Sequence, residues 1–448
     1  MTLKKTILSL VDNIPNPIAK ILIKINIFPN IIFGKNYKNE KLNIKTNGKD
    51  YDNSIDLLKM VNYAIENVPY YMKRYSQINS IEEFENKIGF INKSTTRDYN
   101  KELISENIEK SDYYLITSSG TSGKPLELLI HKNSYQKERA FLHSIWEKKG
   151  YKHHTRAVLR NRKLSNGKDY IINFISKEYI FDAFRNTDIY YKKIYGIIKK
   201  ANIKYIHAYP SSAYSFSTFL HNNNLDVSFL NGFICSSENI LEHQRRLITK
   251  KLKLELVTIY GHSERIVVAG NCKNSDLYHI EPQYGYFELI DKNDNVIKNI
   301  GETGEIVGTT LDNYGMPLIR FKTGDLATYA GNYCEHCQRN VPLLKNIEGK
   351  WSGRRIFGAN NAEITPTSLV LHDDLLNFID GIQYIQKEKG KLTILIIKSK
   401  NFNDNHEKRL LEHHIRKFSK DTIIKIKYVE KLIKQPNGKF LDLISTVK

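Results

Sequence analysis

A loop rich in hydroxyl groups and glycine occupies residues 117–125, with the sequence Thr-Ser-Ser-Gly-Thr-Ser-Gly-Lys-Pro. Glycine lets backbone N–H groups approach an anion closely, and hydroxyl and ammonium groups add donors and positive charge. The loop therefore predicts a phosphate-binding site. Its candidate ligands are Ser118, Ser119, Gly120, Thr121, Ser122, Gly123 and Lys124.

The residues around this loop exclude the Walker type of phosphate loop. A Walker loop needs Ser or Thr directly after Gly-Lys, and then a helix. Here Pro125 follows Lys124, and the apolar run at 126–130 has the pattern of a strand. Another apolar run precedes the loop at 113–116. We therefore expect the loop to join two strands.

Four further segments follow the loop in a characteristic order. They are 260–264 (Tyr-Gly-His-Ser-Glu), 317–325 (ending in Thr-Gly-Asp), 353–354 (Gly-Arg) and 436–440 (Pro-Asn-Gly-Lys-Phe). Together with the loop, they resemble the motifs of the adenylate-forming superfamily, which includes acyl-CoA synthetases and peptide-synthetase adenylation domains. The segments at 68–71, 91–97, 236–238 and 438–440 resemble the phenylacetate-CoA ligase-like group, especially members associated with capsule or surface-polysaccharide biosynthesis. The resemblance extends from about residue 60 to the C-terminus.

The resemblance implies an α/β fold with two domains. A large N-terminal domain, residues 1–352, would carry the ATP and acyl sites in layered α/β structure with a β-rich subdomain. A small, mobile α+β domain, residues 353–448, would act as a lid. The apolar periodicity is compatible with this division. It predicts helices at 56–67, 133–149, 366–378 and 405–418, and strands at 204–208, 232–235, 255–260, 285–290, 304–308, 382–386, 391–398 and 422–429.

The implied reaction is ATP-dependent activation of a carboxylate as an acyl-adenylate, followed by transfer to a thiol, coenzyme A. Adenylation brings anions together, so donors and a divalent cation must offset the charge. By resemblance, Glu264 would hold Mg²⁺, Asp325 would accept hydrogen bonds from the ribose hydroxyls, and Arg354 would contact ribose or phosphate. Lys439 would reach the reacting atoms from the lid, with Thr121 and Lys124 as its catalytic partners. The nucleotide would also contact Ser236, Ser237, Glu238, Tyr260, Gly261, His262 and Ser263.

The acyl group and its acceptor stay open at this point. His207 and Tyr209 fall in the zone that lines the acyl pocket of related enzymes, although a histidine beside a strand end is often only structural. Instead of coenzyme A, the acceptor could be an amine, a sugar or a carrier protein.

Four residues have the chemistry of a zinc site. Cys334 and Cys337 have metal-knuckle spacing, and Cys272 and His279 supply the remaining two ligands of a tetrahedral ion. The alternative is a reduced, metal-free loop. Cys235 is better interpreted as a small buried hydrophobic residue.

The composition leaves two other interpretations to weigh. The chain has 68 basic and 48 acidic residues, a net charge of +20, which is compatible with nucleic-acid binding by a zinc-knuckle protein. That hypothesis leaves the five ordered motifs unexplained, so we expect no nucleic-acid partner. The scattered lysines would attract anionic ATP and coenzyme A. Residues 18–27 form a basic amphipathic segment that either contacts a membrane surface or packs on the enzyme. No apolar run reaches the length of a membrane span, and we expect a cytoplasmic enzyme.

Overall fold

The computed structural model describes most of the 448-residue chain. Described are residues 14–25, 29–118, 126–349, 355–433 and 443–447, except 161, 163, 165–166, 186, 239, 241, 361, 365–368, 370, 372–374, 376–377 and 400. The predicted phosphate loop beyond Ser118, the hinge residues Gly353 and Arg354, and Lys439 lie outside this set.

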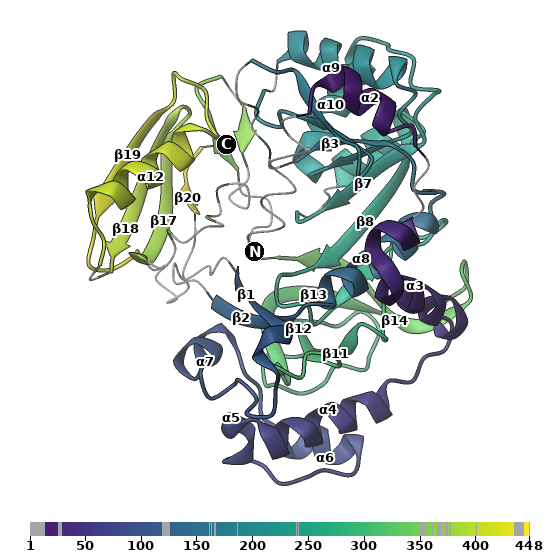
Figure 1. The fold of residues 1–448 in the computed structure, drawn as a ribbon, viewed down its shortest axis with the longest axis vertical. Coiled ribbons are helices and arrows are strands. Elements are labelled where there is room, and N and C mark those ends of the chain that lie inside the picture. Colours follow the sequence, from purple (N-terminus) through teal and green to yellow (C-terminus); the bar gives the residue numbers. More distant parts are fainter. Residues whose placement is uncertain are drawn as a thin grey trace.

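A twelve-stranded sheet forms the centre of the described N-terminal part (Figure 1). Its order is β11-β12-β13-β14-β10-β9-β8-β7-β6-β3-β5-β4. The bounds are β3 (Arg156–Leu159), β4 (Tyr170–Asn173), β5 (Glu178–Phe181), β6 (Tyr205–Ala208), β7 (Gly232–Ser236), β8 (Glu255–Gly261), β9 (Val268–Gly270), β10 (Tyr278–Ile280), β11 (Gly285–Ile290), β12 (Thr303–Thr310), β13 (Phe321–Cys334) and β14 (Arg339–Glu348). The strands β5, β3, β6, β7 and β8 are parallel, whereas β8 through β14 pair antiparallel.

Helices cover both faces of the parallel half. Successive strand residues point to opposite faces, and on β7 Phe233 packs in one apolar cluster while Ile234 packs in another. The first cluster includes α9 (Asp188–Lys200) and α10 (Pro210–Asn222), and the second includes α3 (Pro29–Asn47) and α8 (Ser134–Glu147). A short helix, α11 (Glu242–Arg246), precedes β8. This burial on two sides explains why these strands are almost continuously apolar.

The remaining N-terminal elements pack on the antiparallel half. They are α4 (Ser54–Asn67), α5 (Pro69–Met72), α6 (Ile81–Lys87), α7 (Lys93–Asp98) and the hairpin of β1 (Tyr113–Ser118) and β2 (Leu126–His131). Their apolar side chains join those of β12 and β13 in one core. The prediction that two strands flank the phosphate loop is confirmed, because β1 and β2 pair antiparallel on either side of it.

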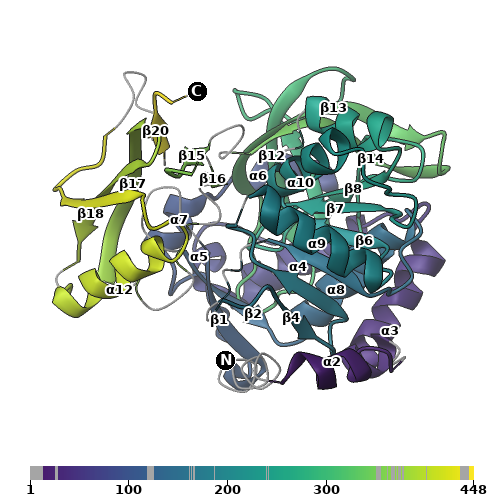
Figure 2. The ribbon, with the colours of Figure 1, turned by 90° about the horizontal axis from the view of Figure 1, so that it is seen from above.

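A second, smaller unit follows the large sheet. It contains β17 (Ile379–Glu388), β18 (Lys391–Lys398), α12 (Asp404–Ile415), β19 (Ile423–Tyr428) and β20 (Leu443–Ser445), and the strand order is β19-β18-β17-β20 (Figure 1). Figure 2 shows α12, β17, β18 and β20 from above. A short pair, β15 (Ile356–Phe357) and β16 (Glu363–Ile364), precedes them. These elements have their own apolar core. The predicted α/β fold with a smaller α+β part is confirmed, while the predicted helix at 366–378 lies largely outside the described residues.

The basic segment near the N-terminus packs on the large unit. In α2 (Asn16–Leu22), Ala19 is buried and belongs to the same core as α9 and α10, whereas Ile18 and Ile21 are exposed. Within the part of the chain that is described, we find no helix long and apolar enough to cross a membrane.

Candidate functional site

Four parallel strands end side by side at one edge of the sheet. Leu159 of β3 lies opposite Ala208 of β6, Ala208 opposite Cys235 of β7, and Ser236 opposite Ile259 of β8. In open α/β sheets, ligands bind outside the carboxyl ends of such strands. The residues that follow these strands are therefore the first place to look for a site: Arg160, Tyr209, Ser237 and His262.

A cavity of about 360 Å³ lies at this edge. Part of its lining comes from three segments that the sequence assigns to the nucleotide. They are Thr117 at the start of the predicted phosphate loop, Ser236 and Ser237, and Gly261, His262 and Ser263. The structure thus brings together residues of three segments that are remote from one another in the sequence.

Asp325 and Tyr260 form a hydrogen-bonded pair. The Tyr260 hydroxyl donates to Asp325 Oδ2 at 3.0 Å, and burial, followed by the Asp325 charge, raises the pKa of Tyr260 well above its ordinary value. Two neighbouring residues shape the backbone here. Gly324 has a φ of 78°, and the backbone N–H of Asp325 donates to Thr323 Oγ1 at 3.0 Å. Asp325 is only half-buried, so a carboxylate of fixed orientation remains accessible. Tyr260, predicted to stack on adenine, also positions this carboxylate.

Glu264 is buried next to two basic groups. Lys93 Nζ lies 3.0 Å from Glu264 Oε1, and His262 Nδ1 lies 3.6 Å from Oε2. Burial favours the protonated form of Glu264, but Lys93 and His262 outweigh it and lower the pKa to about 2. Glu264 is therefore ionised at neutral pH, as a Mg²⁺ ligand must be. Lys93, at the start of α7, was not predicted as a partner.

Glu238 faces the segment that enters the smaller unit. Its carboxylate accepts hydrogen bonds from Ser211 N (3.1 Å) and Ser211 Oγ (3.3 Å), and lies 3.7 Å from the Arg355 guanidinium. It does not line the cavity with Ser236 and Ser237. The geometry thus connects Glu238 to the residue that directly follows the predicted hinge.

The four residues predicted to bind zinc lie together. The ligand atoms of Cys272, His279, Cys334 and Cys337 are all within 4.8 Å of one another. Strand pairing explains this, because β10, which carries His279, lies between β9 and β14, and Cys334 ends β13, which pairs with β14.

The distances within this cluster suit a tetrahedral ion. Cys272 Sγ lies 3.9 Å from Cys334 Sγ, and two thiolates about 2.3 Å from a tetrahedral Zn²⁺ would be about 3.8 Å apart. His279 Nδ1 lies 3.0 Å from Leu277 O, to which it can donate, and within the described structure His279 Nε2 is buried without a partner. A carbonyl that holds one ring nitrogen leaves the other free to bind a metal. Cys235 is buried elsewhere, in the core with α9 and α10.

A buried ion cluster adjoins these residues. Arg339 donates to both oxygens of Glu281, at 3.0 and 2.6 Å, and Lys148 Nζ lies 2.6 Å from Glu281 Oε1. Arg339 also donates to Gly48 O at 2.6 Å. The strands around the four-residue cluster are therefore joined to α8 and to the segment after α3.

Arg320, upstream of Asp325, is a structural residue. Its guanidinium donates to both carboxylate oxygens of Glu288 and stacks on the Phe90 ring at 3.9 Å. It is buried and does not line the cavity.

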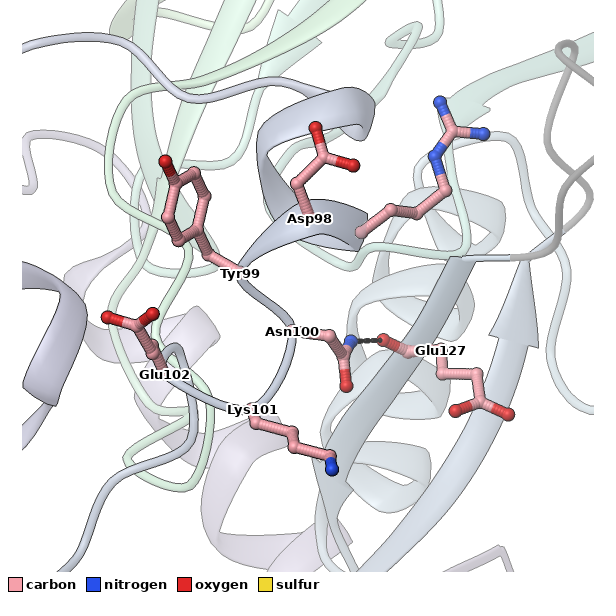
Figure 3. A pocket seen from close by; sticks show the side chains of 7 residues that line it. Asp98, Tyr99, Asn100, Lys101, Glu102 and Glu127 are labelled. Atoms are coloured by element: carbon pink, nitrogen blue, oxygen red, sulfur yellow. Dashed lines mark hydrogen bonds between the residues drawn. The ribbon is translucent and has the colours of Figure 1, made fainter.

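A second cavity, of about 620 Å³, lies beside α7 and β2 (Figure 3). Its lining comes from one stretch, 97–102, and from Glu127. The side chains of Asp98, Tyr99 and Lys101 point in different directions, and Asn100 Nδ2 donates to Glu127 O at 2.8 Å (Figure 3). Residues of the predicted site are absent from this lining, so the cavity at the strand ends is the better candidate.

Comparisons with known proteins agree with the fold and with its smaller unit. Residues 358–446 match the CapK C-terminal domain family. The comparison with curated protein sequences found no match.

Among solved structures, the chain is similar to 2-hydroxyisobutyryl-CoA ligase in complex with 2-HIB-AMP and CoA in the thioesterification state. The TM-score is 0.56 at 16% identity over 87% of this chain and 88% of that chain. The same ligase in its postadenylation state has a TM-score of 0.53 at 15% identity, again over 87% and 88% of the chains. An open conformation has a TM-score of 0.52 at 16% identity over 87% and 90%. The described fold is therefore similar to that of these ligase structures, and residues 358–446 match the CapK C-terminal domain family, in agreement with the capsule-associated branch that the motifs resemble.

Proposed function

We propose that the protein is an ATP-dependent carboxylate ligase that forms an acyl-adenylate and transfers the acyl group to a thiol, coenzyme A. The observation that carries this proposal is the cavity at the ends of β7 and β8. Segments that are remote in sequence, and that were each assigned to the nucleotide, meet there. The similar 2-hydroxyisobutyryl-CoA ligase, solved with an acyl-adenylate and CoA, supports the proposal.

Each part of the reaction has a candidate residue. Asp325, held by Tyr260, would accept hydrogen bonds from the ribose hydroxyls. Ionised Glu264 would bind Mg²⁺, which would offset charge on the phosphates. Residues 118–124 would donate to the β- and γ-phosphates, and Arg354 would contact ribose or phosphate. Lys439 would bring its charge to the α-phosphate and the attacking carboxylate only when the lid closes.

The proposed domain boundary is 352/353, with the lid at 353–448. The large sheet ends with β14 at Glu348, and the short strand β15 begins at Ile356 before the smaller sheet. These element bounds are compatible with the proposed boundary.

We further propose that Cys272, His279, Cys334 and Cys337 hold one structural Zn²⁺. The donor set and its spacing fit a closed tetrahedral site, which leaves no position for a catalytic water. The ion would hold β10 to the turn between β13 and β14, and so stabilise the strand that carries Asp325.

A second candidate differs in the acceptor. As the resemblance to the capsule-associated branch implies, the acyl group would then pass to an amine, a sugar or a carrier protein in surface-polysaccharide biosynthesis. Both candidates share the adenylation step and differ only in the acceptor.

Two assays in sequence test the proposal. Carboxylate-dependent ATP–pyrophosphate exchange across a library of acids reports adenylation before the acceptor is known. Once an acid is identified, loss of free thiol from added CoA is compared with acyl transfer to amines and amino sugars. Exchange activity without any carboxylate dependence, or none with any acid, refutes a carboxylate ligase. Transfer to amines with no consumption of CoA favours the second acceptor.

A further inference from the structure

Arg160 brings a positive charge to the cavity at the strand ends. It directly follows β3 and lines the cavity. Its Nη1 donates to His207 Nε2 at 2.7 Å and to Ser236 Oγ at 3.0 Å, and its Nη2 donates to Ser237 Oγ at 3.1 Å. The guanidinium also lies 5.0 Å from the centre of the Tyr209 ring. Three neighbouring strands therefore fix the side chain.

These contacts leave the charge of Arg160 uncompensated by the described residues. A guanidinium only donates, so His207 Nε2 must accept, and His207 is neutral with its proton on Nδ1. Burial, followed by the nearby Arg160, lowers the pKa of His207 well below its ordinary value, in agreement with a neutral ring. The serines are neutral as well. Within the described structure, no carboxylate lies within 4.0 Å of the Arg160 guanidinium.

The other arginine of the cavity differs in this respect. Arg265 lies 3.3 Å from Glu138, which also lines the cavity, so this pair is neutral overall. The hydrogen bonds to His207, Ser236 and Ser237 use three of the five N–H donors of Arg160, and the Tyr209 hydroxyl lies within reach of another. Arg160 thus combines positive charge with remaining donor capacity.

The position of Arg160 separates it from the proposed ribose site. Arg160 and His207 come from β3 and β6, whereas Tyr260, which holds Asp325, comes from β8, on the other side of β7. The cavity that Arg160 lines also has the apolar side chains of Leu142, Ile259 and Val268 in its lining. These side chains would accommodate a short carbon chain between Arg160 and an adenylated carboxylate.

We propose that this site selects acids with a second anionic group, such as dicarboxylic acids, and that Arg160 binds that second group. This inference rests on the proposed carboxylate ligase function and specifies its substrate class. A carboxylate would form charge-assisted hydrogen bonds with the planar guanidinium, which a methyl group cannot form. A site built for such bonds rejects an analogue that lacks the partner, because its polar groups are then left unpaired.

Matched pairs of acids test the inference in the exchange assay. Glutarate is compared with valerate, and succinate with butyrate, so that chain length is constant within each pair. We expect the wild type to prefer each diacid by at least about tenfold in kcat/KM. Arg160→Leu should lower kcat/KM for the diacids by at least about tenfold more than it lowers kcat/KM for the monoacids. Arg160→Lys keeps the positive charge and should therefore retain a preference for diacids. A variant with only a folding defect would show no such preference.

Arg74→Leu is the matched control. Arg74 also stacks on a tyrosine, 3.9 Å from the centre of the Tyr70 ring, but lies outside the cavity. Its replacement should leave the diacid preference unchanged. Exchange with a preference for monoacids overturns the inference and leaves the proposed ligase standing. An equal loss for diacids and monoacids with a raised KM for ATP places Arg160 at the nucleotide, which also overturns it. No exchange with any acid refutes the ligase function itself.

Discussion

Replacement of Arg320 by methionine should lower the free energy of unfolding by about 3–5 kcal/mol at neutral pH. Arg320 Nη2 lies 2.7 Å from Glu288 Oε1 and Nε lies 3.3 Å from Oε2, while Nη1 donates to Glu85 O at 2.9 Å and Ile88 O at 2.8 Å. The side chains of Arg320 and Glu288 are only 3% and 2% exposed. Methionine fills much of the same volume, but it leaves a buried carboxylate and two carbonyl groups without these donors.

The loss should depend on pH, with a sign that follows from Glu288. Burial raises the pKa of Glu288 above its ordinary value, and Arg320 opposes that rise. Without Arg320, the pKa of Glu288 in the folded state rises further. At pH values between the ordinary carboxyl pKa and this higher pKa, the folded state then binds more protons than the unfolded state. Stability of the variant then falls as pH rises through this window. The difference from wild type should be largest near pH 7–8 and smaller near pH 5.

Urea unfolding followed by far-UV circular dichroism measures this difference. With a slope of about 3 kcal/mol/M, the expected loss lowers the midpoint by about 1 M or more at pH 7. The Arg320→Met/Glu288→Gln double variant should recover part of the loss, because it removes the buried charge. Lys73→Met is the control, since the Lys73–Glu102 ion pair is exposed and should contribute under about 1 kcal/mol. A loss below about 1 kcal/mol in Arg320→Met, or a loss that grows on acidification, would refute the reasoning.

Three other substitutions address the proposed site. Lys439→Ala should abolish ATP–pyrophosphate exchange, while ATP affinity, measured by calorimetry, stays within about twofold. The reason is that this lysine would act in the transition state. Exchange at the wild-type rate would contradict that role. Asp325→Ala removes an acceptor whose charge-assisted hydrogen bonds are each worth about 1.5–3 kcal/mol. ATP affinity should therefore fall by about ten- to a hundredfold. An unchanged affinity would count against the ribose assignment. Purified wild type should contain one zinc ion per chain by elemental analysis. The Cys272→Ser/Cys334→Ser double variant should lose both the metal and thermal stability. Zinc retained at full stoichiometry in that variant would refute the proposed site.

Much of the fold was predictable because local signals and tertiary packing agree. The parallel strands at the centre are apolar on both faces, and the helices at 54–67 and 134–147 bury one stripe each, so the periodicity matches the final structure. The four candidate zinc ligands were predicted from residue type and spacing, and the strand pairing of β10 with β9 and β14 brings them together. The resemblance supplied the remaining site residues. Their roles stay predictions, for the described residues as well as for Lys439.

Three partner residues had no local signal. Lys93 is separated from Glu264 by more than 170 positions, and a lysine at the start of a short helix looks like any solvent-exposed cation. Arg320 lies in the predicted ribose segment, yet its partner Glu288 is on β11 and the pair is buried away from the cavity. Arg160 follows a four-residue strand and contacts residues 47 to 77 positions away. Ion pairs and hydrogen bonds of this kind depend on tertiary packing, which a single sequence does not reveal.

Sheet topology supplies the missing signal for Arg160. Once β3, β6, β7 and β8 are known to be parallel neighbours, the residue after each strand becomes a candidate without any motif. That criterion selects Tyr209, Ser237 and His262, all of which the sequence had associated with the acyl or nucleotide site, and it adds Arg160 to them. Because Arg160 contacts Ser237 and lies against the Tyr209 ring, it shares one cluster with two of the three. Sheet topology thus selects Arg160, and Arg160 brings positive charge to a cavity that residues of the predicted motifs line. Substitution of Arg160 should therefore reveal which class of acid the protein activates.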